Sequence, residues 1–229
     1  RCLAKAIDHD MTEGHELAKL LMQRNELMVR RAMADVLTRL FRRLGDEALP
    51  FYYQLKDDSD SDILAAVSTT SADLRFLDVD MWAENLVELS NHELPVVRRN
   101  LVPSLREYFE TFPDDTRKLL PVMWQDGDEV VRTRMRELLI KMSDISSTQF
   151  GARITDLNQH GCDLSALWRL MDARRKGSSE AWKSWLSGEG EMPETIETMR
   201  HVSTMQAPEE LPDLSEALET LDEELGFLD

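Results

Sequence analysis

Apolar residues recur along the chain at helical spacing, and polar turns interrupt them at regular intervals. In the segment NELMVRRAMADVLTRLF the apolar positions fall three and four residues apart, as on one face of an α-helix. Other apolar segments precede the polar stretches QRNE, KDDSDSD, SNHELP and QDGDE. Each unit therefore predicts a first helix, a polar turn and a second helix of roughly four turns.

These units repeat with a constant step, which the second helices show most clearly. A Val-Arg pair opens the second helix at Val29, Val97 and Val131, and Ile63 stands at the intermediate position. The units therefore repeat with a step of 34 residues. An apolar column follows the same step without insertion: Leu21, Leu55, Leu89, Met123 and Leu157. Because one helix pair cannot bury its apolar stripe alone, the period predicts units that stack in a row.

The acidic turns, followed by Val-Arg at positions 29, 97 and 131 and then by an apolar stripe, resemble the pattern of HEAT-repeat proteins. The resemblance covers about residues 1–180. It implies an all-α fold, a right-handed α-solenoid of about five two-helix HEAT-like repeats. It also implies that the second helices line the concave face. The same 34-residue period fits tetratricopeptide repeats as well, but their small-residue and Gly pattern is absent from the first helices.

The solenoid is expected to span residues 1–187. Residues 1–8 match the end of a second helix and are interpreted as the end of a preceding repeat. Residues 178–187 are predicted to form a capping helix, in which Trp182 and Trp185 cover the last apolar stripe. Since the sequence starts within a unit, we expect it to be part of a longer chain or a larger complex.

Residues 188–229 form an acidic tail with three prolines. Asp213 and Glu216 make a capping-box pattern that predicts an amphipathic helix near 213–226. Its apolar stripe supplies the candidate docking residues Leu214, Leu218, Leu221, Leu225 and Phe227. A short helix of this kind needs a groove. The tail is therefore expected to dock on its own solenoid, to dock on a partner, or to stay disordered and compete for a basic surface.

The charge is distributed unevenly along the chain. The net charge is −17 over 229 residues. The five second-helix windows nevertheless contain 17 Lys and Arg against 9 Asp and Glu; these windows are 29–44, 63–78, 97–112, 131–146 and 165–180. With the second helices lining the concave face, as the resemblance implies, that face is basic. A guanidinium fork matches carboxylate and phosphate groups. The candidate partner-binding residues are Arg39, Arg42, Arg43, Arg99, Arg106, Arg134 and Arg175.

Three further arginines directly follow the repeated valines. They are Arg30, Arg98 and Arg132. Their constant place in the unit favours a structural role, in which they bond the turn acids of the adjacent unit.

The sequence contains no nucleotide-binding, hydrolase or zinc motif. The separation of His15-Glu16 from His92-Glu93 is not a multiple of the repeat step, so these pairs predict no common metal site. We therefore expect no enzymatic activity, no cofactor and no metal. Cys2 and Cys162 cannot form a disulfide scaffold, and no apolar run approaches a membrane span, so a cytoplasmic location is expected, or a nuclear one in a eukaryote.

Together these features predict a non-enzymatic interaction scaffold, or adaptor, for other proteins. It would bind an acidic or phosphorylated partner segment on the Arg-rich concave face, with the acidic tail as a modulator. The alternative is a nucleic-acid-binding HEAT-like protein, including a role similar to the HEAT-like DNA alkylation-repair glycosylases. Their aromatic and acidic signature is not matched, because Trp124 and Asp126 fall in a turn. A third interpretation is a structural segment of a larger repeat protein.

Overall fold

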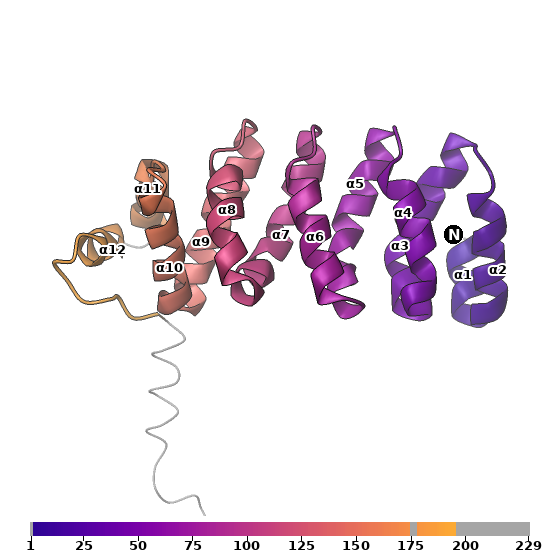
Figure 1. The fold of residues 1–229 in the computed structure, drawn as a ribbon, viewed down its shortest axis with the longest axis horizontal. Helices are drawn as coiled ribbons and strands as arrows, with labels where there is room; N and C mark the ends of the chain where they lie inside the picture. The colour runs from indigo at the N-terminus through magenta and orange to yellow at the C-terminus, as the bar shows by residue number, and fades with distance from the viewer. Residues whose placement is uncertain (1, 175–177, 196–229) are drawn as a thin grey trace, which may run out of the picture.

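The computed structural model describes residues 2–174 and 178–195, and every regular element in these two ranges is a helix. The prediction of an all-α fold is therefore confirmed. Figure 1 shows the helices following one another in chain order from one end of the molecule to the other. The α-helices are α1 (Cys2–His9), α2 (Met11–Met22), α3 (Leu27–Leu44), α4 (Leu49–Lys56), α5 (Ser61–Thr70), α6 (Val79–Ser90), α7 (Pro95–Thr111), α8 (Pro113–Trp124), α9 (Glu129–Ile145), α10 (Ser147–Gln159), α11 (Ser165–Arg174) and α12 (Ser178–Leu186). Two 3₁₀-helices, η1 (Gly45–Ala48) and η2 (Ser71–Phe76), extend α3 and α5.

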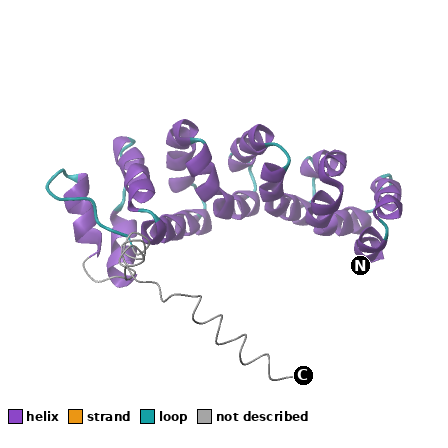
Figure 2. Cartoon of the chain, turned by 90° about the horizontal axis from the view of Figure 1, so that it is seen from below, coloured by secondary structure: helices purple, strands orange, loops and turns teal. Residues whose placement is uncertain are grey.

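The helices lie in two rows that form a shallow arch (Figure 2). The inner row consists of α1, α3, α5, α7 and α9, and the outer row of α2, α4, α6, α8 and α10. Successive helices pack more closely in the inner row than in the outer row. The inner row therefore lies on the concave side, and gaps between helices open on the outer side.

The polar turns join each outer helix to the following inner helix. In two of these turns an aspartate caps the N-terminus of the inner helix. Asp60 accepts hydrogen bonds from the backbone N–H groups two and three residues ahead, at the start of α5. Asp128 does the same at the start of α9. A side-chain oxygen at this position satisfies N–H groups that have no partner within the helix. The acidic turns therefore determine where these inner helices begin.

The apolar column of the 34-residue step lies in the core. Leu55, Leu89, Met123 and Leu157 are at most 4% exposed, and Leu21 packs against the core from its edge. The corresponding column of the inner row, Leu37, Leu105 and Leu139, is fully buried. Because each helix pair shares these contacts with its neighbours, one continuous core runs along the molecule.

The second unit departs from the predicted four-turn helix. Its inner helix ends at Thr70 and continues as the 3₁₀-helix η2. The Ser68 and Ser71 hydroxyls donate to carbonyl oxygens three residues earlier, at 2.8 and 2.6 Å, and Thr70 donates to the carbonyl four residues earlier. Such side chains compete with the regular backbone hydrogen bonds of a helix. The Ser/Thr-rich sequence thus shortens α5.

At the C-terminal end, α12 packs across α10. Trp182 is buried, and its ring meets the ring of Phe150 edge-on with centroids 4.6 Å apart. Trp185 lies against Gly151, where an added Cβ would come within 2.8 Å of the indole. The two tryptophans thus cover part of α10.

Candidate functional site

The arginines that follow the repeated valines lie between neighbouring turns. Arg98 on α7 donates from Nε and Nη2 to Asp126, at 2.7 and 2.9 Å. Its Nη1 donates to the carbonyl oxygens of His92 and Glu93. The Arg98 side chain is 15% exposed and that of Asp126 only 6%. This guanidinium therefore joins two successive turns and is not available to a partner.

Arg30 makes the equivalent contact, because its Nε donates to Asp58 at 2.7 Å. Arg132 does not reach the next turn. It pairs with Glu129 on its own helix and donates to the carbonyl of Asp126. All three arginines thus make structural contacts, but those of Arg132 lie within its own unit.

A second bidentate ion pair, or fork, lies beside the fork of Arg98 and Asp126. Arg99 donates from Nε and Nη2 to the Asp128 carboxylate, at 2.8 and 2.5 Å, and Arg31 pairs with Asp60 in the same way. The hydrogen bond from Arg99 holds the pKa of Asp128 well below its ordinary range, and Arg31 lowers the pKa of Asp60. The structure thus places Arg99, a predicted partner-binding residue, in a bidentate ion pair between helices. We leave it out of the candidate site.

Two other predicted binding residues lie further along the inner row. Arg106 pairs with Glu110 one turn ahead at 3.0 Å. Arg134 is exposed and donates from Nη1 to the carbonyl oxygen of Arg99 at 2.8 Å. Arg106 is therefore locally neutralised, whereas Arg134 keeps its full charge beside α7.

The remaining arginines gather at the N-terminal end of the inner row, on the last two turns of α3. Arg39 and Arg43 share the carboxylate of Asp8 on α1, at 3.4 and 3.5 Å. Arg42 makes no ion pair or hydrogen bond with the described residues. Two guanidinium groups thus share the carboxylate of Asp8, which is itself 45% exposed, and Arg42 and the exposed Asp35 stand nearby on α3. This cluster, Arg39, Arg42 and Arg43, is called the α3 arginine cluster below.

A pocket of about 540 Å³ opens beside the α3 arginine cluster. Its lining comes from α1 and α3: Ala4, Ala32, Asp35, Val36, Thr38, Arg39 and Arg42. Two of the lining residues, Ala4 and Ala32, have small side chains. The geometry suits an extended anionic segment that places carboxylate or phosphate groups at the guanidinium groups.

Several predicted residues lie outside the described part of the chain. These are Arg175 and the docking stripe of Leu214, Leu218, Leu221, Leu225 and Phe227. Their roles stay predictions.

Within residues 2–174 and 178–195, no three His, Cys, Asp or Glu side chains are grouped so that they could hold a metal ion. His15 pairs with Glu47 through Nδ1 at 3.0 Å, and His92 Nδ1 accepts from the N–H of Leu94. The two His-Glu motifs thus serve separate local contacts. In the same two ranges, no helix combines the length and the apolar character that crossing a membrane requires.

Comparison with known protein families, with curated proteins and with solved structures finds no match for this chain.

Sequence reasoning misses two parts of this site. One is Asp8 as the counter-ion of α3, although Asp8 stands one full repeat step before Arg42 and so occupies the same place in the preceding unit. The other is the pocket itself, whose lining includes the small residues Ala4 and Ala32. Their exposure depends on how α1 packs on α3, and no spacing in the sequence reports it.

Proposed function

We propose that this chain is a HEAT-like α-solenoid that serves as a non-enzymatic interaction scaffold. Its inner row would bind an acidic or phosphorylated segment of another protein at the α3 arginine cluster. The solenoid assignment is supported by the 34-residue step, by its buried columns and by the two rows of helices. The pairing of outer and inner helices through acidic turns supports the HEAT-like type.

The observation that carries the function is the excess of positive charge beside the pocket. The three arginines stand against two carboxylates, Asp8 on α1 and the exposed Asp35 that lines the pocket, which leaves one positive charge in excess. The ion pairs of Arg39 and Arg43 with Asp8 are long, at 3.4 and 3.5 Å. Exposed ion pairs of this kind contribute little, on the order of 1 kcal/mol or less. A partner carboxylate or phosphate can therefore replace Asp8 at small cost, and bidentate contacts would set its position.

The nucleic-acid alternative has less support. A duplex or single strand needs a continuous track of cations along its phosphates. In the middle of the inner row, Arg75 pairs with Glu107, and Arg99 pairs with Asp128. The free arginines are therefore confined to short stretches of the described inner row.

Binding of a fluorescein-labelled peptide, Gly-Asp-Glu-phosphoserine-Asp-Glu-Gly, would test the proposal by anisotropy. We expect the triple variant Arg39→Gln, Arg42→Gln, Arg43→Gln to weaken binding about tenfold or more. The matched control, Lys19→Gln, Arg24→Gln, Arg117→Gln, removes three charges elsewhere and should change affinity less than about twofold. Asp8→Asn should strengthen binding, because the peptide no longer competes with that carboxylate.

Two results would overturn the proposal. One is an equal loss of affinity in both triple variants, which would mean general charge attraction. The other is tighter binding of a single-stranded oligonucleotide of the same charge with a steep salt dependence, which would favour the nucleic-acid alternative.

A further inference from the structure

A second pocket lies on the outer row, between α6 and α8. Its volume is about 610 Å³. The walls are apolar and come from both helices: Ala83 and Val87 on α6, and Leu119 and Val122 on α8. Val87 and Val122 are 42% and 52% exposed, so the apolar surface continues onto the rim.

The 34-residue step explains why the pocket exists. In the preceding gap, between α4 and α6, Tyr53 reaches across and its hydroxyl donates to the sulfur of Met81 at 3.0 Å. One step later the same two places hold Val87 and Asp115, which both line the pocket. A tyrosine and a methionine are thus replaced by shorter side chains, and the gap between the outer helices stays unfilled.

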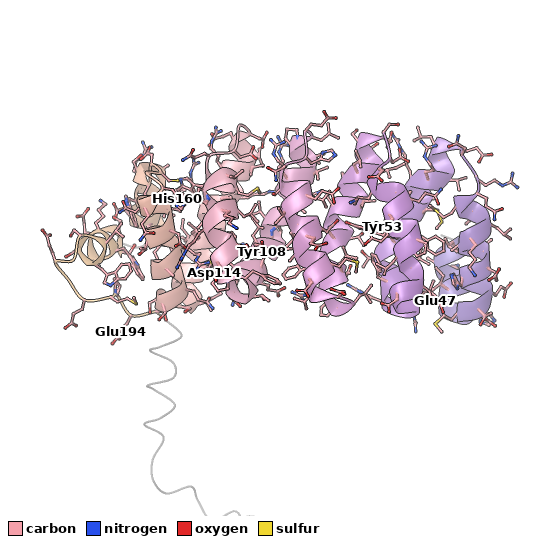
Figure 3. The ribbon with its side chains drawn as sticks, viewed as in Figure 1. Glu47, Tyr53, Tyr108, Asp114, His160 and Glu194 are labelled. Atoms are coloured by element: carbon pink, nitrogen blue, oxygen red, sulfur yellow. The ribbon has the colours of Figure 1, made fainter. Side chains whose placement is uncertain are left out.

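Tyr108 of α7 gives the pocket a polar end. It is 1% exposed and lines the pocket, yet its hydroxyl makes no hydrogen bond with the described residues. Burial raises the pKa of Tyr108, and the neighbouring Asp115 carboxylate raises it further, so the hydroxyl is protonated. Figure 3, in which the outer row faces the viewer, labels both Tyr53 and Tyr108. The hydroxyl oxygen is not one of the buried, unpaired side-chain atoms of the described residues, so it stays accessible to a water molecule or a ligand in the pocket.

The rim of the pocket is acidic. Glu84, Glu88 and Asp115 line it, against the single cation Lys118 among the described lining residues. The Lys118 Nζ lies 3.6 Å from Asp115, and Lys56 holds Glu88 at 2.5 Å, whereas Glu84 makes no ion pair with the described residues. With Asp115 and Glu88 paired to lysines, Glu84 leaves the rim one negative charge in excess, which favours a cationic partner, opposite to the α3 arginine cluster.

We propose that the α6–α8 pocket binds one aromatic side chain from a partner protein, in a segment where basic residues flank the aromatic residue. The size follows from the neighbouring gap, which the side chain of Tyr53 spans to reach Met81. The Tyr108 hydroxyl and the Asp115 carboxylate offer partners for a phenol or indole group, and the acidic rim receives the flanking lysines or arginines. One buried aromatic anchor inside a polar rim is a common arrangement in protein interfaces.

This docking surface is independent of the proposed function, because it lies on the other row and selects the opposite charge. A chain that binds through both surfaces would join an acidic segment and a basic aromatic segment. The acidic residues 188–229 of this chain do not have the charge that the rim favours.

The test uses the full chain and a fluorescein-labelled peptide, Gly-Lys-Lys-Tyr-Lys-Lys-Gly. We expect binding that weakens at least about tenfold when Ala replaces the Tyr, or when Glu replaces the four Lys. Val87→Tyr should fill the pocket and weaken binding to a similar extent. The matched control, Leu20→Tyr, adds the same ring to an exposed site on α2 and should leave the affinity unchanged.

Two further variants keep the test decisive if Val87→Tyr fails to fold. Tyr108→Phe removes only the hydroxyl, and it should weaken the Tyr peptide several-fold more than the matching Phe peptide. Glu84→Gln should weaken both peptides. The proposal is overturned if the Ala peptide binds as well as the Tyr peptide. It is also overturned if Val87→Tyr folds and binds normally, or if a peptide of residues 210–229 binds more tightly than the basic peptide.

Discussion

His92 takes the place of Asp126 in the turn one 34-residue step earlier. Its Nδ1 accepts a hydrogen bond from the N–H of Leu94 at 3.1 Å, as the Asp126 carboxylate accepts one from the N–H of Asp128 at 2.8 Å. Arg98 pairs with Asp126, and the corresponding place one step earlier, which would face His92, holds Leu64. In these two turns the arginine and its aspartate are thus both present or both absent, which avoids an unpaired buried charge.

The buried fork of Arg98 and Asp126 should contribute strongly to stability. We expect Arg98→Ala to lower the free energy of unfolding by about 2 to 4 kcal/mol, because it leaves the Asp126 carboxylate buried without its charged partner. Arg106→Ala, which removes an exposed pair with Glu110, should cost about 0.5 kcal/mol. Urea unfolding followed by circular dichroism compares the two. Equal losses would show that the fork is no more than a surface pair.

The chain should lose stability in acid, because protonation of Asp128 removes its ion pair with Arg99. The pKa of Asp128 lies below its ordinary value of 3.8 because Arg99 donates to the carboxylate. A depressed folded-state pKa stabilises the fold above the unfolded pKa, and this contribution is lost as the pH falls through the folded pKa. We therefore expect the midpoint temperature of unfolding to fall when the pH is lowered below about 4. Asp128→Asn should flatten this dependence, since Asn still caps α9 but cannot form the ion pair.

A control for the acid experiment is Asp114→Asn, which removes one exposed carboxylate from the first turn of α8. It should leave the steepness of the acid transition unchanged. The same slope in Asp128→Asn as in the unmodified chain would contradict the assignment of the acid transition to this fork.

The turn at His92 should tolerate aspartate better than alanine. His92→Asp restores a carboxylate that can accept from the N–H of Leu94, whereas His92→Ala leaves that N–H without its acceptor. We expect His92→Ala to cost about 1 kcal/mol and His92→Asp to cost clearly less. Thermal unfolding at neutral pH measures both variants. A larger loss for His92→Asp would mean that the ring itself, and not its acceptor nitrogen, supports the turn.

Gly14 should be required for the close packing of α1 on α2. A Cβ at this position would lie 2.6 Å from the backbone Cα of Ile7. Although alanine favours the helix, we expect Gly14→Ala to destabilise the chain by about 1 to 3 kcal/mol through overpacking. Gly127→Ala, where an added Cβ meets open space, is the matched control and should be nearly neutral. The midpoint of thermal unfolding would separate the two outcomes.

The α3 arginine cluster depends on the same packing, because Asp8 of α1 faces Arg39 and Arg43. Gly14→Ala should therefore also change binding of the acidic phosphopeptide. A change in stability without any change in affinity would show that α1 does not shape that pocket.

The sequence by itself determined the helices, their 34-residue step and the buried columns, because each depends on local periodicity. Leu55, Leu89 and Met123 had to be buried for a helix pair to hide its apolar face. It also predicted the bonding of Arg30 and Arg98 to turn acids, since both partners recur at a fixed spacing. The shorter α5 was not predicted, because Ser68 and Thr70 fit the pattern of apolar and polar positions of a full-length helix as well as that of a shortened one.

Only the tertiary structure decided which charges are free and where pockets open. Arg99 and Arg42 stand on similar basic helices, yet Asp128 neutralises the first and no described residue neutralises the second. The α6–α8 pocket likewise depends on how far Val87 and Asp115 reach across a gap set by the arch of the two rows. Spacing along a chain specifies which residues share a helix face. The distance between faces of different helices is set by the packing of the whole core.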